Sequence, residues 1–161
     1  MIDEIYLDMD QVLCDYDYWL DFHNARMPNG KSDWALLDEI GPIYWAKMPW
    51  LESGRQLYKD VLKYCNKYSL KLGILSAVGL NCGKIGKHQW LKENCPEVPL
   101  NTIILADKGD EKYKWAKPNR LLIDDREKIC NAFIEAGGNA IQYTGNNIET
   151  FKQIKKLIGY R

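Results

Sequence analysis

The sequence of 161 residues is 46% hydrophobic and 27% charged, a composition that supports a buried core and excludes an intrinsically disordered chain. The 22 Lys and Arg residues balance 22 Asp and Glu residues without a basic run, so we expect no long nucleic acid as a partner. No segment approaches the roughly 20 apolar residues that span a bilayer, and the first residues carry no signal-peptide pattern, so we expect no membrane partner.

Short apolar runs alternate with longer amphipathic stretches, which predicts an α/β fold with a doubly wound parallel sheet. Five strands are expected, at 4–7, 71–75, 102–106, 121–123 and 140–142. Helices are expected at 54–67, 84–93, 128–136 and 148–158. A capping box of Ser53 and Gln56 is predicted to begin the first of these helices, and Asn147 is predicted to cap the last.

The connection between the first strand and the helix at 54–67 is far longer than the roughly 2–6 residues usual in such folds. It is rich in rings, holding four of the six tryptophans and several tyrosines: Tyr16, Tyr18, Trp19, Trp34, Tyr44, Trp45 and Trp50. Such rings either form the core of a small helical insertion or line a pocket for a planar base, and the two roles are compatible. We expect a single domain, 1–161, with a core of 1–15 and 53–161 and an insertion of about 16–52.

Two carboxylates, Asp8 and Asp10, directly follow the first predicted strand. Side chains of an extended segment alternate, so both point to the same side, and the carboxyl ends of parallel strands are where ligands bind. Acids at strand ends are also common turn residues, and the pair alone leaves that role open. Two acids that face one site repel each other unless a cation lies between them or they take different roles.

Polar side chains also follow the second and fourth predicted strands. Ser76 offers a small hydroxyl that can bind a phosphate oxygen, although serine at this place is also a common turn residue. Asp124 and Asp125 are adjacent acids at a buried strand end, where a structural role rarely needs both. These strand ends predict one site that combines a hydroxyl with several carboxylates.

A lysine-rich stretch lies before the fourth predicted strand, and by default it is a solvated helix face. One lysine in it can reach inward to the carboxylates. We favour Lys112, which stands four residues before Ala116 in a helix leading to the last strand end. Lys108 and Lys114 remain open alternatives.

Taken in order, these residues resemble the four motifs of haloacid dehalogenase (HAD) phosphatases, and the insertion lies where that family places its first type of cap. Within the family the sequence is most similar to the 5'(3')-deoxyribonucleotidases. The likeness rests on Leu7-Asp8-Met9-Asp10-x-Val12-Leu13, on Met48-Pro49-Trp50-Leu51-Glu52-Ser53-Gly54 and on Leu121-Leu122-Ile123-Asp124-Asp125-Arg126. Two positions depart from the family pattern: Gln11 replaces a frequent Gly, and Ala77 replaces a second small polar residue. The Ala77 departure weakens the case for a deoxyribonucleotide.

The resemblance implies a Mg²⁺-dependent phosphatase in which Asp8 attacks phosphorus and forms an aspartyl phosphate. Asp10 is then the general acid and base. The implied Mg²⁺ ligands are Asp8, the backbone carbonyl of Asp10 and Asp124, with Asp125 as a further ligand or a neighbour of the ligands. Ser76 and Lys112 are the implied contacts to the phosphate oxygens of the substrate, a small phosphorylated molecule, most simply a nucleoside monophosphate.

Three further basic residues and several other functions are alternatives to this interpretation. His23 and His88 lack metal-type spacing and are expected at the surface or in packing. Lys87 lies in a segment where the nucleotidases have a basic phosphate contact, but we expect it to be solvated. Alternative activities are a polynucleotide 3'-phosphatase or a small-metabolite phosphatase, and the alternatives outside catalysis are a phosphoacceptor signalling domain or a binding domain. Five scattered cysteines without a Cys-x-x-Cys pair predict reduced, mostly buried thiols and a cytoplasmic location.

Overall fold

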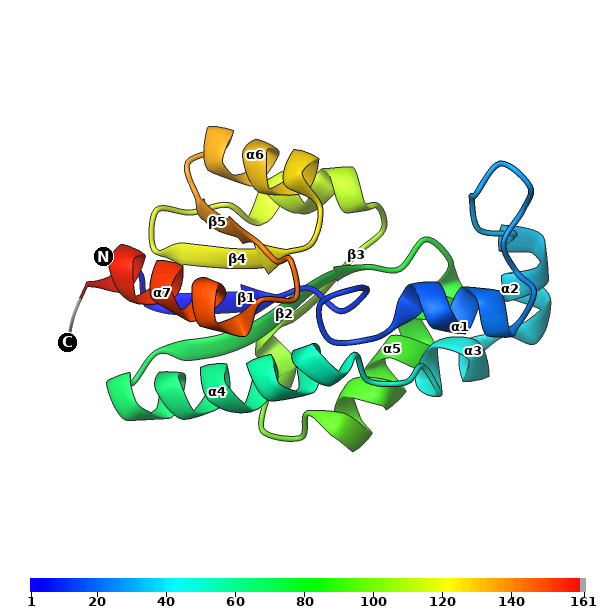
Figure 1. The fold of residues 1–161 in the computed structure, drawn as a ribbon, viewed down its shortest axis with the longest axis horizontal. Helices are drawn as coiled ribbons and strands as arrows, with labels where there is room; N and C mark the ends of the chain where they lie inside the picture. The colour runs from blue at the N-terminus through cyan, green and yellow to red at the C-terminus, as the bar shows by residue number, and fades with distance from the viewer. Residues whose placement is uncertain (160–161) are drawn as a thin grey trace.

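A computed structural model describes residues 1–159 and contains a five-stranded parallel sheet (Figure 1). The strands are β1 (Glu4–Leu7), β2 (Lys71–Ala77), β3 (Ile103–Ala106), β4 (Arg120–Asp124) and β5 (Asn139–Gln142). Their order is β3-β2-β1-β4-β5, and every neighbouring pair is parallel. The predicted α/β class and the parallel sheet are therefore confirmed, with strand ends shifted by only a few residues.

Seven α-helices and two short 3-10 helices accompany the sheet within residues 1–159. The α-helices are α1 (Tyr16–Phe22), α2 (Trp34–Ile40), α3 (Pro42–Ala46), α4 (Glu52–Tyr68), α5 (Asn81–Asn94), α6 (Glu127–Glu135) and α7 (Asn147–Ile158). The 3-10 helices are η1 (Leu100–Thr102) and η2 (Gly109–Trp115). None of the helices in this part of the chain is long and apolar enough to cross a membrane.

The two faces of the sheet bury two separate sets of apolar side chains, because successive residues of a strand point to opposite sides. Ile5 and Leu7 of β1 pack with residues of α4, α5 and α7, whereas Tyr6 packs with Leu122 and with Phe133 of α6. Figure 1 shows α6 above the sheet and α4 below it. The sheet is thus covered on both faces, as a parallel sheet requires.

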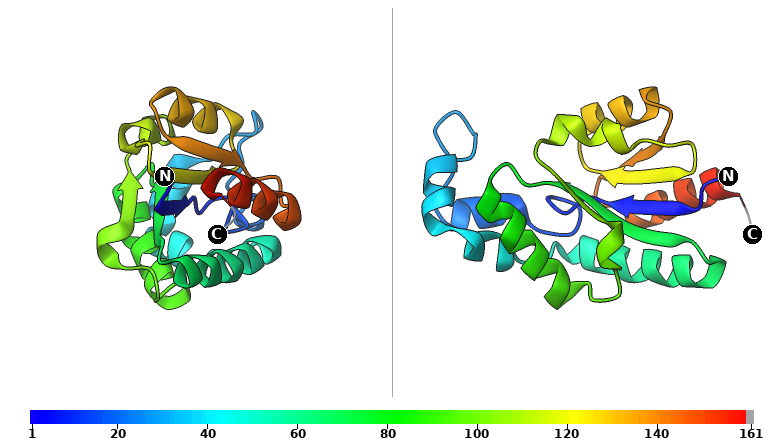
Figure 2. Two further views of the ribbon diagram at one scale, coloured as in Figure 1. Left: turned by 90° about the vertical axis from the view of Figure 1, so that its left-hand side faces the viewer. Right: turned by 180° about the vertical axis from the view of Figure 1, so that it is seen from behind.

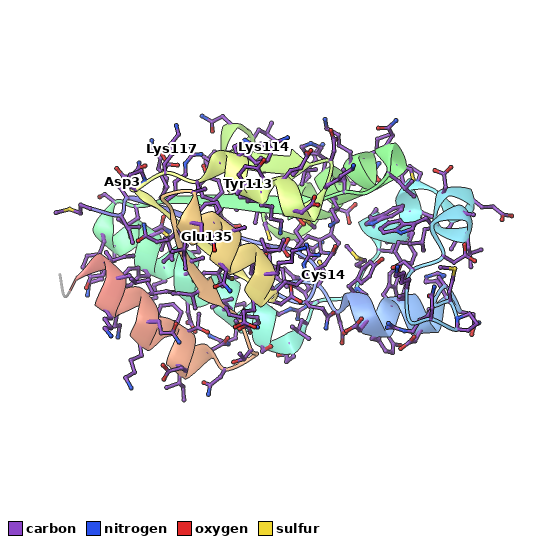
Figure 3. The ribbon with its side chains drawn as sticks, turned by 90° about the horizontal axis from the view of Figure 1, so that it is seen from above. Asp3, Cys14, Tyr113, Lys114, Lys117 and Glu135 are labelled. Carbon is purple, nitrogen blue, oxygen red and sulfur yellow. The ribbon has the colours of Figure 1, made fainter. Side chains whose placement is uncertain are left out.

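The insertion between β1 and α4 holds α1, α2 and α3 and lies beyond the carboxyl ends of the strands, toward which β1 and β4 point (Figures 1 and 2). The chain passes into and out of the insertion through two paired segments. The N–H of Asp15 donates to the carbonyl of Pro49 at 2.9 Å, and the N–H of Leu51 donates to that of Leu13 at 2.8 Å. Cys14 lies at this junction (Figure 3).

Helix α3 packs tightly against α5, and two glycines of α5 permit this contact. A Cβ at Gly86 would clash with the carbonyl oxygen of Pro42 and lie 2.8 Å from the Cβ of Trp45. A Cβ at Gly83 would lie 3.2 Å from the Trp45 ring. The indole N–H of Trp90, farther along α5, donates to the carbonyl of Met48 at 2.8 Å. The insertion is therefore fixed to the core along α5.

Two helix starts differ from the sequence prediction. Helix α4 begins at Glu52 after Leu51, with no side-chain cap, so the predicted capping box of Ser53 and Gln56 is wrong. The reason is that the paired segment holds Leu51 in an extended conformation, which leaves Ser53 already inside the helix. At α7 the cap is Asn146, one residue before the predicted Asn147, and its side chain accepts from the N–H of Glu149.

Gly54 lets the first turn of α4 lie directly on the loop that follows β1. A Cβ at this position would clash with the carbonyl oxygen of Val12 and lie 2.9 Å from the Cα of Leu13, and both are backbone atoms that cannot turn aside. We expect Gly54→Ala to lower the free energy of unfolding by about 1–3 kcal/mol, the usual cost of overpacking. Urea denaturation followed by circular dichroism measures this difference.

The matched control for that variant is Gln56→Ala, which changes an exposed side chain on the same helix. Since Gln56 makes no capping contact, its replacement should change the unfolding free energy by no more than about 0.5 kcal/mol. Equal stability of Gly54→Ala and the wild type would show that the loop and helix separate without cost.

Candidate active site

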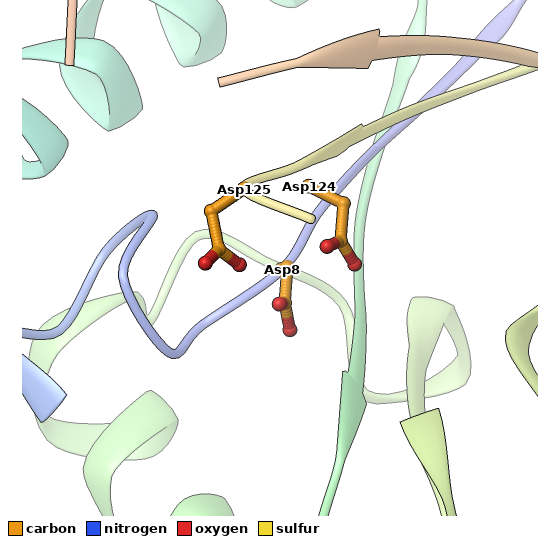
Figure 4. A group of neighbouring side chains, drawn as sticks. All are labelled: Asp8, Asp124 and Asp125. Atoms are coloured by element: carbon orange, nitrogen blue, oxygen red, sulfur yellow. The ribbon is translucent and has the colours of Figure 1, made fainter. Parts of the chain in front are cut away.

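The two acidic strand ends meet because β1 and β4 are neighbours in the sheet, with Leu7 opposite Ile123. This is the point where the strand order reverses, and such switch points are the usual ligand sites of open α/β sheets. Carboxylate oxygens of Asp8, Asp124 and Asp125 all lie within 4.8 Å of one another. Figure 4 shows the three side chains converging from the ends of the two strands.

Lys112 is the lysine that reaches these acids. Its ammonium nitrogen lies 2.9 Å from Oδ1 of Asp8 and 2.6 Å from Oδ2 of Asp124, and the side chain is 1% exposed. Lys108 lines the cavity described below, whereas Lys114 is exposed and pairs with Glu111 (Figure 3). The 3-10 turn of η2 gives neighbouring lysines different directions, and only Lys112 contacts both acidic strand ends.

The charges of this cluster are not balanced, since it holds three carboxylates and Lys112 pairs with two of them, Asp8 and Asp124. Burial raises the pKa of Asp8, but Lys112 and Lys87 more than offset this, so that the pKa lies below its ordinary value. Burial and the charge of Asp8 raise the pKa of Asp124. Burial, Asp8 and Asp124 together raise the pKa of Asp125 to about 7. The cluster therefore has room for further positive charge.

Asp10 lies in a tight loop that starts immediately after Asp8. The carbonyl of Met9 accepts the N–H groups of Leu13 and Cys14, both at 2.8 Å, which closes the loop. Gln11 has a φ of +59°, a left-handed conformation that Gly adopts without steric cost. This explains why the family that the sequence resembles often has Gly at this position. Oδ1 of Asp10 is buried and has no hydrogen-bond partner among residues 1–159.

The expectation that Lys87 is solvated is wrong. The side chain is fully buried, and its nitrogen lies 2.9 Å from Oδ2 of Asp10 and 3.1 Å from the hydroxyl oxygen of Ser76. Sequence reasoning missed it because a lysine on an amphipathic helix is normally exposed. Gly83 and Gly86 on the same helix were the available signal, because they mark the face of α5 that is packed against α3.

A cavity of about 460 Å³ opens over the site, within the range typical of small-molecule pockets. Of the residues proposed from the sequence, Asp8, Asp10, Lys112 and Asp125 line it. Ser76 and Asp124 are fully buried. The proposed residues thus gather in one place, with four of them at the surface of the cavity.

The outer wall of the cavity combines aromatic rings from the insertion with cations from the core. Its lining includes the rings of Tyr16, Trp34 and Trp45, the cations Lys108 and Arg126, and two further acids, Asp17 and Asp107. Trp34 is 47% exposed, and its ring lies so close to Gly79 that a Cβ there would be 2.9 Å from it. The cavity lining therefore combines aromatic rings from the insertion with charged groups of both signs.

The histidines and cysteines do not join this site as ligands. His23 packs among Trp19, Phe22 and Tyr44 inside the insertion, and His88 is exposed on α5. All five cysteines are free thiols and four are buried, in agreement with the prediction. Burial raises the pKa of both Cys65 and Cys130 to about 12, so these thiols are unreactive packing groups at neutral pH.

No model of a known protein family matches the sequence, and no curated protein matches it. Solved structures resemble the fold. A hydrolase from Pseudomonas syringae has 16% identity and a TM-score of 0.53 over 93% of this chain and 90% of that chain. An uncharacterised protein from Corynebacterium glutamicum has 14% identity and a TM-score of 0.53 over 100% and 98% of the two chains.

A HAD family enzyme from Bacteroides thetaiotaomicron, solved as an aspartate-to-alanine variant in complex with magnesium and inorganic phosphate, has 14% identity and a TM-score of 0.50. The likeness covers 91% of this chain and 96% of that chain. These structures show that the protein has the fold of HAD enzymes, an α/β sheet with a Rossmann-like core.

Proposed function

We propose that this protein is a Mg²⁺-dependent phosphomonoester hydrolase in which Asp8 is the nucleophile. The observation that carries the proposal is the cluster of Asp8, Asp124, Asp125 and Lys112 at the switch point of the sheet, beneath a cavity. A carboxylate nucleophile with a neighbouring ammonium and further carboxylates is the set that phosphoryl transfer through an aspartyl phosphate needs. The HAD fold of the chain supports the same chemistry.

The residues of the site fit a magnesium ion. Asp8, Asp124 and Asp125 supply only oxygen atoms, which Mg²⁺ prefers, and their shared negative charge exceeds that of Lys112. The backbone carbonyl of Asp10 is the further ligand that we propose. When bound, Mg²⁺ offsets the repulsion between the Asp8 carboxylate and a phosphate dianion. The magnesium bound by the Bacteroides enzyme of the same fold supports this assignment.

The proposed reaction has two steps that use the residues of the β1 loop. A carboxylate oxygen of Asp8 bonds to phosphorus as the ester oxygen leaves, and Asp10 protonates that oxygen. Asp10 then takes a proton from water as the water oxygen bonds to phosphorus and the Asp8 carboxylate leaves. The Asp10 side chain is 32% exposed and lines the cavity over Asp8, which is the place that both proton transfers require.

The phosphate group is proposed to lie beside Asp8, where the cations that line the cavity can contact its oxygens. Lys112 contacts Asp8, and Lys108 and Arg126 line the same cavity, so positive charge is available on the side where the phosphate oxygens would lie. We retain Ser76 as a proposed contact of these oxygens. Its oxygen accepts from Lys87, which leaves its own proton free to donate to Asp8 or to a phosphate oxygen.

The finer proposal is a 5'-nucleotidase acting in the cytoplasm, with residues 16–52 as a cap that selects the substrate. The rings of Tyr16 and Trp34, which line the cavity, support a planar base as part of the substrate. A sugar phosphate or another small metabolite is the second candidate, because Ala77 stands where deoxyribonucleotidases have a polar residue. A polynucleotide 3' end is the third.

The test is phosphate release from a panel of substrates with and without Mg²⁺. The panel holds ribo- and deoxyribonucleoside 5'- and 3'-monophosphates, sugar phosphates and a 3'-phosphorylated oligonucleotide. Turnover of one class only in the presence of Mg²⁺ supports the proposal and names the substrate. If no compound releases phosphate but acetyl phosphate labels the protein stably, the signalling alternative would stand instead. If there is neither release nor labelling, the binding alternative would stand.

We expect Trp34→Leu to raise the KM for nucleoside monophosphates about tenfold at nearly unchanged kcat, because base stacking on an aromatic ring contributes about 1–3 kcal/mol. The KM for sugar phosphates should change by no more than about twofold, because these substrates have no base that could stack on the ring. Phe22→Leu is the matched control, an insertion ring that is 60% exposed and removed from the cavity lining. Equal changes of KM for both substrate classes would contradict a base-stacking role.

A further inference from the structure

Lys87 is a buried cation whose place the proposed reaction does not by itself explain. Its side chain is 0% exposed, and its nitrogen meets three acceptors: Oδ2 of Asp10 at 2.9 Å, the hydroxyl oxygen of Ser76 at 3.1 Å and the carbonyl oxygen of Ala77 at 2.6 Å. An ammonium has three N–H donors, so each has a partner. The direction of the Lys87 side chain is therefore fully determined.

The helix that carries Lys87 is itself held in place. Gly86, its neighbour in sequence, packs against the backbone of α3, and Trp45 lies against both Gly83 and Gly86. Because the backbone of α5 is fixed on that side, the ammonium of Lys87 presents a stationary positive charge at the end of β2. Burying a charge is costly unless it is paired, and here the paired charge is the Asp10 carboxylate.

The two oxygens of Asp10 are consequently in different situations. Oδ2 is bound to Lys87, whereas Oδ1 is buried without a hydrogen-bond partner among residues 1–159. Asp10 also lines the cavity over Asp8. The ion pair with Lys87 restricts rotation of the carboxylate and so keeps the Asp10 side chain in one position at this cavity.

We propose that Lys87 is a positioning residue for proton transfer, which holds the Asp10 carboxylate at the cavity over Asp8, where the leaving-group oxygen would lie. This inference rests on the proposed phosphatase function. It assigns Lys87 a role different from that of Lys112, which contacts Asp8 and Asp124 and thus acts on the nucleophile and the phosphate. Loss of Lys87 should harm only those reactions whose leaving group needs a proton.

The test compares two substrates of similar size, benzyl phosphate and p-nitrophenyl phosphate, with the full-length protein and Mg²⁺. The alkoxide of benzyl alcohol must be protonated as it leaves, whereas p-nitrophenolate leaves without a proton. For Lys87→Met we expect kcat/KM to fall roughly 100-fold for benzyl phosphate, as for a misplaced general acid, and less than about threefold for p-nitrophenyl phosphate. The ratio kcat/KM reports the first phosphoryl transfer, in which the leaving group departs.

Two further variants make the comparison specific. Lys84→Met removes an exposed lysine one turn earlier on α5 and should leave both values unchanged. In an Asp10→Asn background, Lys87→Met should cause no further change in the ratio of the two substrates, because the group that it positions is already lost. If Lys87→Met does not fold, Lys87→Gln keeps two N–H donors without the charge and serves in its place.

The outcomes separate the inference from the function on which it rests. Equal loss on both substrates would mean that Lys87 is only structural, and no loss on either would mean that Asp10 needs no such support; both results overturn the inference while the phosphatase stands. Wild type that hydrolyses neither these two esters nor any member of the substrate panel in the presence of Mg²⁺ would overturn the proposed function and the inference together.

Discussion

Asp8→Asn should abolish Mg²⁺-dependent phosphate release, lowering kcat by at least about 10⁴-fold on every ester that the wild type hydrolyses. An amide has nearly the shape of a carboxylate but is a far weaker nucleophile, and it also removes one of the three carboxylates that face one another above Lys112. Steady-state release of inorganic phosphate measures the loss. Acid-quenched wild type should carry a phosphoryl group by intact-mass analysis, and the variant should carry none.

The control for Asp8→Asn is Asp110→Asn, which makes the same chemical change at an exposed position of η2. It should retain wild-type kcat and KM. Near-UV circular dichroism should show native packing in both variants, so that loss of activity is not loss of fold. Phosphate release by Asp8→Asn at a rate close to that of the wild type would mean that Asp8 is not the nucleophile.

The sheet and its acidic site were predictable because the signals are local. Each strand is a short apolar run, and Asp8, Ser76 and Asp124 follow such runs at the ends that parallel strands share. Local signals do not predict that Asp8 and Asp124 lie next to each other. Their proximity depends on the strand order, in which β4 returns to pair with β1 after β2 and β3 have been placed on its other side.

The features that the sequence did not predict depend on contacts between distant segments. Lys87 is buried because α3, from the insertion, covers α5 where Gly83 and Gly86 permit it, and neither helix reveals this alone. Ser53 fails as a cap because the pairing of Leu51 with Leu13 sets where α4 begins. In both cases tertiary contacts override a sound local rule.

The choice among the lysines before β4 could be predicted only in part. Spacing alone left Lys108, Lys112 and Lys114 open, because an α-helix and a 3-10 helix direct successive side chains differently. The observed 3-10 geometry of η2 turns Lys112 toward the acids and leaves Lys114 in solvent. The preference for Lys112 agrees with this placement, but its assignment as a phosphate contact remains a proposal.

Lys112→Met should both inactivate the protein and destabilise it by roughly 3–5 kcal/mol, the usual cost of breaking a buried ion pair by removing one partner. Asp8 and Asp124 are nearly inaccessible to solvent, and without the ammonium their charges would repel each other with no counter-charge between them. If the acids bind Mg²⁺ as proposed, the ion replaces part of the lost positive charge. Millimolar Mg²⁺ should therefore raise the melting temperature of Lys112→Met more than that of the wild type.

Urea denaturation measures the loss of stability, and thermal unfolding with and without Mg²⁺ measures the shift of melting temperature. Lys114→Met is the matched control, since Lys114 pairs with Glu111 at the surface. Removal of that exposed pair should change stability by no more than about 1 kcal/mol and leave the response to Mg²⁺ as in the wild type. A Lys112→Met protein as stable as the wild type in the absence of Mg²⁺ would show that the acids already relieve their repulsion by taking up protons. If the variant is destabilised but Mg²⁺ raises its melting temperature no more than that of the wild type, the carboxylates at the ends of β1 and β4 do not bind one ion jointly.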